Sequence, residues 1–429
     1  MKRIFVSALC AMAFLGMSAE SLTVQINIHN DSKIDRKDEP VTIQLKDVPA
    51  LNFQVAHAAV KDNGKLVPVQ LDDMDGDYCK DELFFLTDIR AKEKKTFTVT
   101  LTDEVPQQQD VAAVVPRIYT ALQIRDKKDL HPDVSRVEAP GKTNIYNDIY
   151  MHGITIESEY VGYRIYFDER QNIDLYGKKK KQLEIATTQF YTTAEQLAEG
   201  YGTDVLWAGK AIGCGSFKRF RDGEPENWTG DVVDTRGEHI VTTGPLRTVV
   251  EVYDLGMLNP SDVPGKPAGR YDVRQRYTLC AGHRDVKVDV QFSEQPNHAY
   301  NQFCTGVQKV GVTADDSVRL GHTPAGYITP DGVAASWGCD YPDMGKKQLW
   351  GPEAIGMAVY VPKQYIRDQK EDDINYIYAI QPVDREFHYW LTFCCAKEET
   401  DSYHTSKEWF DYMKDWKENI TNPVKVTIK

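Results

Sequence analysis

Two carboxylates that stand two residues apart, Glu157 and Glu159, offer the clearest chemistry in the chain. They lie in the segment 152–168, where apolar and aromatic residues alternate at the period of a β-strand. At about 3.3 Å per residue, their side chains would stand about 6–7 Å apart on one face. The same segment carries Arg164 and three tyrosines. This combination predicts a sheet surface that binds sugar; the alternative is that both glutamates face water at a strand end.

Three reactions on sugars suit these residue types. A lyase acting on a uronic acid needs an arginine to neutralise the carboxylate and a Tyr, His or Lys base to take the adjacent proton. A mutarotase or epimerase needs a carboxylate base and a neutral acid, roles that suit Glu157 or Glu159 with His298. A glycoside hydrolase needs two carboxylates about 5–9 Å apart that flank the bond. Neighbours on one strand face point in parallel, so hydrolysis ranks last.

The candidate site residues come from several segments. The catalytic candidates are Glu157, Glu159, His152, Tyr201 and His298, and the substrate-binding candidates are Tyr160, Arg164, Asp204, Trp207 and Arg247. Structural explanations compete with these roles, because Arg164 suits an ion pair, Asp204 suits a turn cap and Trp207 suits the core. The competing class of function is therefore a glycan-binding protein that lacks a working acid–base pair.

An acidic loop between two expected strands is a candidate calcium site. Its aspartates Asp73, Asp75, Asp77 and Asp81 fall at loop positions one, three, five and nine, the spacing that wraps oxygen ligands around Ca²⁺. The usual glycine at position six is replaced by Tyr78. The loop is therefore either a structural Ca²⁺ site or a solvated acidic turn.

Composition and motifs exclude several classes of function. The net charge of −13 argues against nucleic acid and against anionic membranes, since both require a basic surface. The chain has no Gly-x-Ser-x-Gly, His-Glu-x-x-His or phosphate-loop lysine motif. Serine hydrolases of the elbow type, zinc proteases and nucleotide-binding proteins are therefore set aside. An oligosaccharide, including one that carries uronic acid, remains the expected partner.

The N-terminus has the pattern of a secretory signal peptide. Lys2 and Arg3 precede an apolar run from Ile4 to Leu15, and small residues follow up to Ala19. We expect residues 1–19 to be removed and the protein to be exported to the periplasm or the extracellular space. No other stretch is long and apolar enough to insert in a membrane.

The elements that must position these residues are mostly β-strands. Short alternating segments over 20–102 predict a small sandwich of immunoglobulin-like size. Residues 103–116 form an expected linker. The many antiparallel strand patterns over 117–429 predict a large two-sheet sandwich. Within it, a capping box at Thr405 begins an expected amphipathic helix over 405–420, and 424–429 forms a closing strand.

Four blocks, in order, carry a resemblance to a known family: ESEYVGYRIYFD at 157–168, IDLYGK at 173–178, GTDVLWAGKAIGCG at 202–215 and GPLR at 244–247. The chain resembles the domain-of-unknown-function 4861 family. The resemblance implies a secreted bacterial protein of polysaccharide-degrading gene clusters. It also implies a β-supersandwich similar to that of galactose mutarotases and several polysaccharide lyases.

Overall fold

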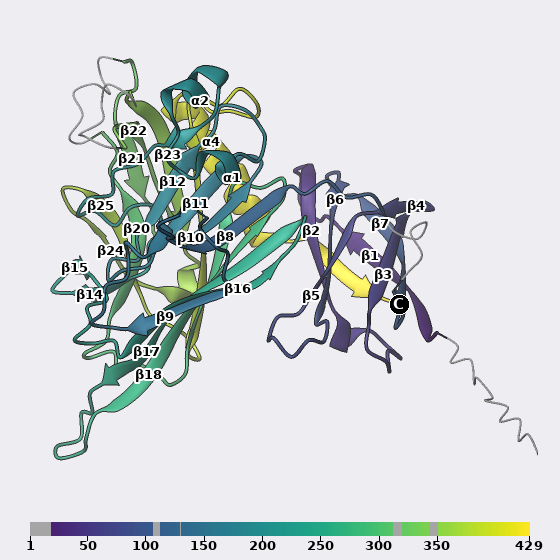
Figure 1. Ribbon diagram of the computed structural model, residues 1–429, viewed down its shortest axis with the longest axis horizontal. Helices are drawn as coiled ribbons and strands as arrows, with labels where there is room; N and C mark the ends of the chain where they lie inside the picture. The colour runs from purple at the N-terminus through teal and green to yellow at the C-terminus, as the bar shows by residue number, and fades with distance from the viewer. Residues whose placement is uncertain (1–18, 106–111, 129, 312–319, 343–350) are drawn as a thin grey trace, which may run out of the picture.

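The computed structural model describes residues 19–105, 112–128, 130–311, 320–342 and 351–429 (Figure 1). Nearly all of the expected signal peptide, and residues 106–111 of the expected linker, lie outside these ranges. All strand pairings within them are antiparallel. The chain forms a small and a large β-domain with a helix near the C-terminus, which confirms the predicted fold class.

The small domain packs two sheets face to face. One sheet has the order β27 (Lys425–Ile428), β1 (Ser21–His29), β7 (Lys94–Thr102), β3 (His57–Asp62) and β4 (Lys65–Val67), and the other has β2 (Arg36–Gln44), β6 (Glu82–Ile89) and β5 (Val69–Asp72). The short helix η1 (Leu45–Asp47) follows β2. In β7, Phe97, Val99 and Leu101 alternate inward and are fully buried, as a half-buried strand requires.

The large domain has three sheets around one main core. The first has the order β13 (Thr203–Asp204), β12 (Ile173–Gly177), β11 (Val161–Tyr166), β10 (Ile149–Ser158) and β8 (Ile118–Ile124). The second has β15 (Glu224–Glu226), β14 (Lys218–Arg221), β20 (Phe303–Gln308), β25 (Asn375–Ile380) and β24 (Ile366–Glu371). The third, with nine strands, has β21 (Ala325–Ile328), β22 (Val333–Asp340), β23 (Glu353–Tyr360), β26 (Glu386–Cys395), β19 (Val286–Phe292), β18 (Gly269–Cys280), β17 (Arg247–Asn259), β16 (Thr235–Thr243) and β9 (Arg136–Pro140). Three short helices, α1 (Ile185–Thr188), α2 (Ala194–Glu199) and η3 (Lys363–Tyr365), lie in the connections.

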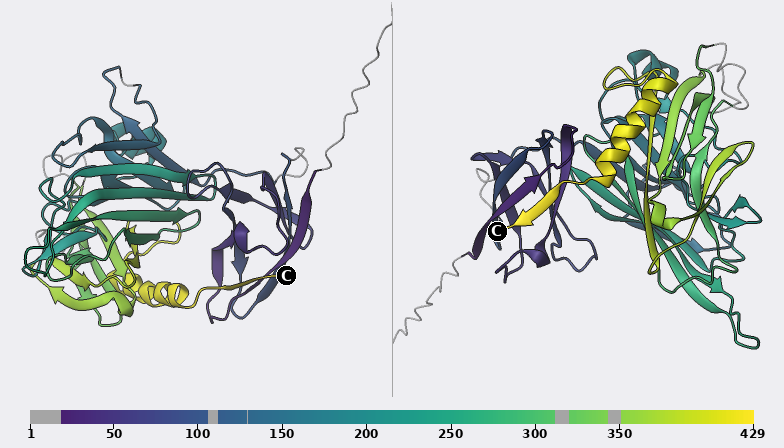
Figure 2. Two further views of the ribbon diagram at one scale, coloured as in Figure 1. Left: turned by 90° about the horizontal axis from the view of Figure 1, so that it is seen from below. Right: turned by 180° about the vertical axis from the view of Figure 1, so that it is seen from behind.

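The C-terminal helix α4 (Ser406–Thr421) covers the outer face of the nine-stranded sheet, as Figure 2 shows. The predicted capping box is present, with Thr405 and Glu408 each bonding the other's backbone. Trp409, Met413 and Trp416 are buried against the sheet. Gly356 on β23 makes room for this contact, because a Cβ there would lie 2.7 Å from the Trp409 ring.

The closing strand corrects the expected domain division. β27 was predicted as part of the large domain, but it crosses back and pairs with β1, with Ile428 opposite Ile26 (Figure 2). Alternation within a strand cannot tell which sheet edge the strand joins, so this pairing was not predictable from local pattern.

No helix in the described ranges has the length and apolar character needed to cross a membrane.

Candidate functional site

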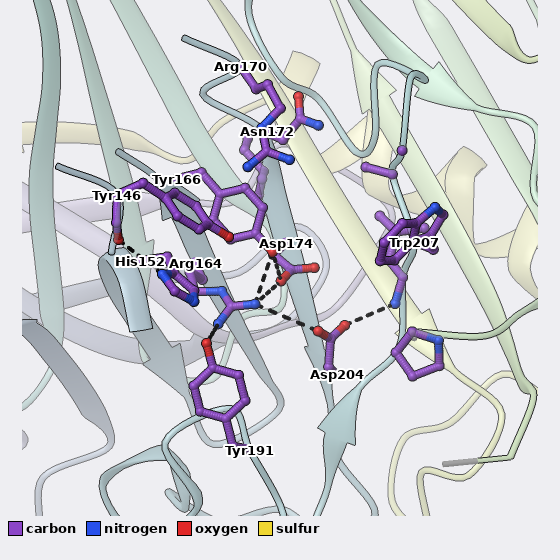
Figure 3. A pocket seen from close by; sticks show the side chains of 15 residues that line it. Tyr146, His152, Arg164, Tyr166, Arg170, Asn172, Asp174, Tyr191, Asp204 and Trp207 are labelled. Carbon is purple, nitrogen blue, oxygen red and sulfur yellow. Dashed lines mark hydrogen bonds and ion pairs between the residues drawn. The ribbon is translucent and has the colours of Figure 1, made fainter. Parts of the chain in front are cut away.

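A pocket of about 210 Å³ opens beside the β8–β13 sheet (Figure 3). We call it the arginine–tyrosine pocket; its polar and aromatic lining consists of Tyr146, His152, Arg164, Tyr166, Arg170, Asn172, Asp174, Tyr191, Asp204 and Trp207. Four of these residues, His152, Arg164, Asp204 and Trp207, are sequence candidates, and the structure brings them together. The aromatic walls and the convergent polar groups are typical of a small-molecule site.

A bulge in β10 aims His152 into this pocket. The pairing of β10 with β8 shifts register between Tyr150 and Thr155. Within the bulge, Met151 and His152 adopt left-handed backbone angles, with φ of 58° and 64°. Two consecutive non-glycine residues in this region store strain, which concentrates at functional sites. The His152 ring stacks on Tyr146, with centroids 4.0 Å apart and planes 2° from parallel.

The hydrogen bonding of His152 determines which ring nitrogen carries the proton. Nδ1 lies 3.0 Å from the backbone carbonyl of Tyr146, which only accepts, so Nδ1 donates and Nε2 keeps a lone pair. Nε2 has no hydrogen-bond partner among the described residues. Burial lowers the pKa of His152, and the nearby Arg164 cation adds to this effect. His152 is therefore a neutral imidazole with a free basic nitrogen.

Arg164 forms the buried centre of the pocket. Its Nη2 makes a close ion pair with Asp174 and also donates a hydrogen bond to the Tyr166 hydroxyl at 3.0 Å. Its Nη1 donates to the Tyr191 hydroxyl at 3.1 Å. The guanidinium also stacks over Phe190, 4.4 Å from the ring centroid. Arg164 is thus held rigidly and its charge is compensated inside the protein.

Asp204 is the second carboxyl group beside Arg164. Its Oδ2 stands 3.7 Å from Arg164 Nη2, and its Oδ1 accepts the backbone N–H of Leu206 at 3.2 Å. Burial and the neighbouring Asp174 carboxylate together raise the pKa of Asp204 well above its ordinary value, although Arg164 opposes the shift. Asp204 is therefore a carboxylic acid that can donate a proton.

The rim of the pocket is more exposed. Arg170 pairs with Asp168 through Nε at 2.6 Å, and 39% of its side chain is accessible to solvent. It also lies over the rings of Tyr146 and Tyr166. Trp207, for which a core position was the favoured explanation, is 54% exposed. An indole and two phenols at the mouth suit stacking against the apolar faces of a sugar.

The paired glutamates lie elsewhere, because the expected single strand over 152–168 is a hairpin. β10 ends at Ser158 and β11 begins at Val161, so Glu159 lies in the turn. Glu157 is fully buried against Lys178 at 2.5 Å and accepts the backbone N–H of Glu184 at 2.7 Å. It therefore holds the start of α1, and it does not line the pocket.

Glu159 and two further candidates, Arg247 and Tyr160, also lie outside the pocket. Glu159 accepts from Arg117 at 2.7 Å, which in turn binds Asp38 of the small domain. Arg247 is buried between Asp72 and Glu82 at the domain interface. The hydroxyl of Tyr160 donates to Asp401 at 2.6 Å.

The last two catalytic candidates are also absent from the lining. Tyr201 follows α2, and its backbone N–H donates to the Gln196 carbonyl. His298 lies 2.8 Å from Gln295 in a loop beyond β19. Neither has the fixed contacts that His152 makes in the pocket.

The sequence analysis missed several pocket residues. They are Tyr146, Tyr166, Arg170, Asn172, Asp174 and Tyr191. A signal existed for one of them, because Asp174 stands directly opposite Arg164 in the β11–β12 pairing, and oppositely charged cross-strand pairs stabilise sheets. Tyr191 follows two left-handed residues, Gln189 and Phe190, that no sequence pattern indicated.

The acidic loop partly gathers its expected ligands. Carboxylate oxygens of Asp73, Asp75 and Asp81 lie within 4.8 Å of one another, whereas Asp77 is not in this group. Tyr78, at the position usually held by glycine, has φ of 70°. Asp73 accepts the backbone N–H groups of Gly76 and Tyr78, and the former lowers the pKa of this carboxyl. Ca²⁺ binding here stays a prediction.

Comparison with known proteins identifies a family. The family profile described as "Domain of unknown function (DUF4861)" matches residues 28–426. None of the curated proteins matches the chain. Among solved structures, the chain is similar to a protein in the Glycosyl Hydrolase Family 38 from Enterococcus faecalis and to an alpha-mannosidase from Enterococcus faecalis V583, each at 9% identity and a TM-score of 0.44. Both alignments cover 95% of this chain but only 47% and 46% of those chains, so this chain spans about half their length.

Proposed function

The chain belongs to the DUF4861 family, and we propose that it is a carbohydrate-active enzyme that transfers protons on a sugar bound in the arginine–tyrosine pocket. One observation carries the proposal. A neutral imidazole with a free nitrogen, His152, and a carboxylic acid, Asp204, line the same aromatic-walled pocket. Environments that separate the pKa values of two titratable groups in this way assign a base and an acid.

The pocket best suits an epimerase or mutarotase type of reaction on an uncharged sugar. For mutarotation, His152 Nε2 takes the proton of the anomeric hydroxyl while Asp204 donates its proton to the ring oxygen, and the ring C–O bond breaks. Closure on the other face returns both protons, so no group is consumed. Arg164 holds the Asp174 carboxylate in an ion pair beside Asp204, and the charge of that carboxylate contributes to the raised pKa of Asp204.

A lyase acting on a uronic acid is the second candidate, and Arg170 favours it. This arginine is the more exposed of the two in the pocket and is directed over the tyrosine rings. In such a reaction a base removes the proton beside the substrate carboxylate, a carbon–carbon double bond forms, and the glycosidic oxygen leaves with a proton from the acid. However, Asp174 and Asp168 already compensate Arg164 and Arg170, so a uronate would compete with two internal carboxylates.

A substrate panel tests both reactions. Purified protein is incubated with uncharged mono- and oligosaccharides and with oligouronates, following anomer or epimer exchange by NMR and the ultraviolet absorbance of new double bonds. His152→Gln and Asp204→Asn should each lower turnover by about 100-fold or more. His298→Gln, a histidine outside the pocket, should leave turnover unchanged and is the matched control.

Two outcomes would redirect the proposal. Binding with neither exchange nor elimination would favour the non-catalytic glycan-binding class. No binding to any member of the panel would defeat the carbohydrate assignment itself.

We also propose that the protein is exported, as the pattern of residues 1–19 predicts. Intact-mass analysis of the natural protein should show a chain that begins near Ala19 or Glu20, and a retained leader would contradict export.

A further inference from the structure

A second and larger cavity, of about 840 Å³, lies between the two domains. Its walls come from β2 of the small domain, from β17, β18, β19 and β26 on the outer face of the nine-stranded sheet, and from α4, which Figure 2 shows leading toward the small domain. We call it the interdomain cavity. Its volume is in the range of natural ligand sites, which often occur at domain interfaces. Two sequence candidates that the arginine–tyrosine pocket lacks, Tyr160 and Arg247, line it.

The charged groups of this cavity are largely paired with each other. Arg36 pairs with Glu39 at 3.1 Å, and Arg247 pairs with Glu82 at 2.7 Å. The same holds along the sheet, where Lys287 pairs with Asp289 at 2.7 Å. A charged ligand would have to displace one of these internal partners. The lining therefore favours a ligand without net charge.

Arg36, a cation of the cavity wall, is held by protein acceptors on both of its Nη atoms. Arg36 is only 5% exposed, and its Nη atoms bond Glu39 and the backbone carbonyls of Asn419 and Asn422. Its Nε–H group is buried and has no partner within the described residues. A buried donor without an acceptor is costly, and because this nitrogen has almost no accessible surface, it is not a contact for a ligand in the cavity.

Aromatic rings complete the lining. Trp390 is half-buried, and Tyr403 and Tyr412 stack with centroids 4.7 Å apart. Rings combined with compensated ion pairs suit a molecule that has apolar faces and many hydroxyls, since a hydroxyl both donates and accepts. A lipid chain would cover these ion pairs without hydrogen bonding to their remaining donors and acceptors. We infer that the interdomain cavity is a second binding site, for an uncharged oligosaccharide; this inference stands independently of the proposed reaction.

Two variants of opposite kinds test the site by titration calorimetry. Trp390→Ala removes a ring from the wall, whereas Thr278→Trp, at a half-buried position on β18, fills the space. The probes are hexasaccharides of mannose, xylose and glucose, with hexagalacturonate as the charged counterpart and a neutral hexapeptide as the competing class. At least one uncharged hexasaccharide should bind the full chain, and both variants should weaken that binding about tenfold or more. Melting midpoints of both variants show that each is folded.

The matched control is Trp207→Ala in the arginine–tyrosine pocket. This variant should reduce turnover of the sugar substrate, and it should still bind the hexasaccharide in the interdomain cavity with wild-type affinity. Unchanged turnover in His152→Gln with this binding event intact would refute the proposed reaction and leave the second site standing. Tighter binding of hexagalacturonate or of the hexapeptide would overturn the inference. So would hexasaccharide affinity unchanged in both cavity variants, or no hexasaccharide binding outside the arginine–tyrosine pocket.

Discussion

His283 joins the two domains and should make their stability depend on pH. The residue lies in the turn between β18 and β19, and its two ring nitrogens face acceptors from different domains. Nε2 lies 2.9 Å from the carbonyl of Asp38, and Nδ1 lies 3.3 Å from the Asp285 carboxylate. Since both partners accept, both nitrogens donate, and the ring is an imidazolium. The carboxylates of Glu39 and Asp38 also interact with the charge of the ring, and Trp416 donates to Asp285 from α4.

The contribution of His283 to the free energy of unfolding follows from the shift in its pKa. Burial alone would lower the pKa of His283, but Asp285 above all, with the Asp38 carbonyl and Glu39, raises it from 6.5 to about 9. The interaction with Asp285 belongs to both residues and is counted once. A difference of this size corresponds to about 3 kcal/mol of stability. Because the folded-state pKa is raised, this contribution is complete below about pH 6.5 and is lost as the pH rises through 9.

Urea denaturation at a series of pH values measures the effect. The free energy of unfolding of the wild-type protein should fall by about 3 kcal/mol between pH 6.5 and 9.5, relative to His283→Gln. Asp285→Asn should remove most of the same dependence, and His298→Gln should retain it. Parallel curves for wild type and His283→Gln over this range would refute the assignment of an imidazolium between the domains.

Four further predictions concern the core, the acidic loop and the pocket. Glu157→Gln leaves Lys178 buried without its partner and should cost about 3–5 kcal/mol in urea denaturation; a large loss of turnover without destabilisation would instead restore a catalytic role for Glu157. Trp409→Ala should lower stability by about 3–5 kcal/mol, and a change below 1 kcal/mol in the same assay would contradict its packing on Gly356. Millimolar Ca²⁺ should raise the melting midpoint, and Asp75→Ala should abolish this rise; an unchanged wild-type midpoint would leave the loop a solvated turn. Since the pKa of His152 is lowered, turnover should persist below pH 6.5 and decline only at more acid pH. If the midpoint of the acid-side decline in the pH–rate profile lies above pH 6.5, His152 is not the neutral base.

The sequence predicted those features that local patterns determine. The antiparallel β-architecture follows from alternation within each strand, and the C-terminal helix follows from its capping box and the spacing of Trp409, Met413 and Trp416. Family membership was also correctly identified, from blocks that include β11 and β12. Each of these conclusions needs only residues that are close in the chain.

The prediction of one long central strand was wrong because alternation continues through a tight turn. Glu159 and Tyr160 join β10 to β11 without glycine, proline or asparagine, so no turn signal interrupts the pattern. The expected spacing of Glu157 and Glu159 depended on that strand. In the structure they have unlike surroundings, one beside Lys178 in the core and the other beside Arg117 at the domain interface.

The pocket itself depends on features that are local in space but not in sequence. Arg164 meets Asp174 only because β11 and β12 pair in one register, and Asp204 approaches only because β13 adds to the next edge. His152 enters through a bulge, and Tyr191 through left-handed residues, and neither carries the glycine that usually announces such a backbone. Strain of this kind persists only where surrounding contacts enforce it, as stacking on Tyr146 and burial of Phe190 do here. Left-handed residues without glycine are therefore hard to predict from the sequence, and the strained backbone at His152 is a physical reason to expect the chemistry there instead of at the glutamate pair.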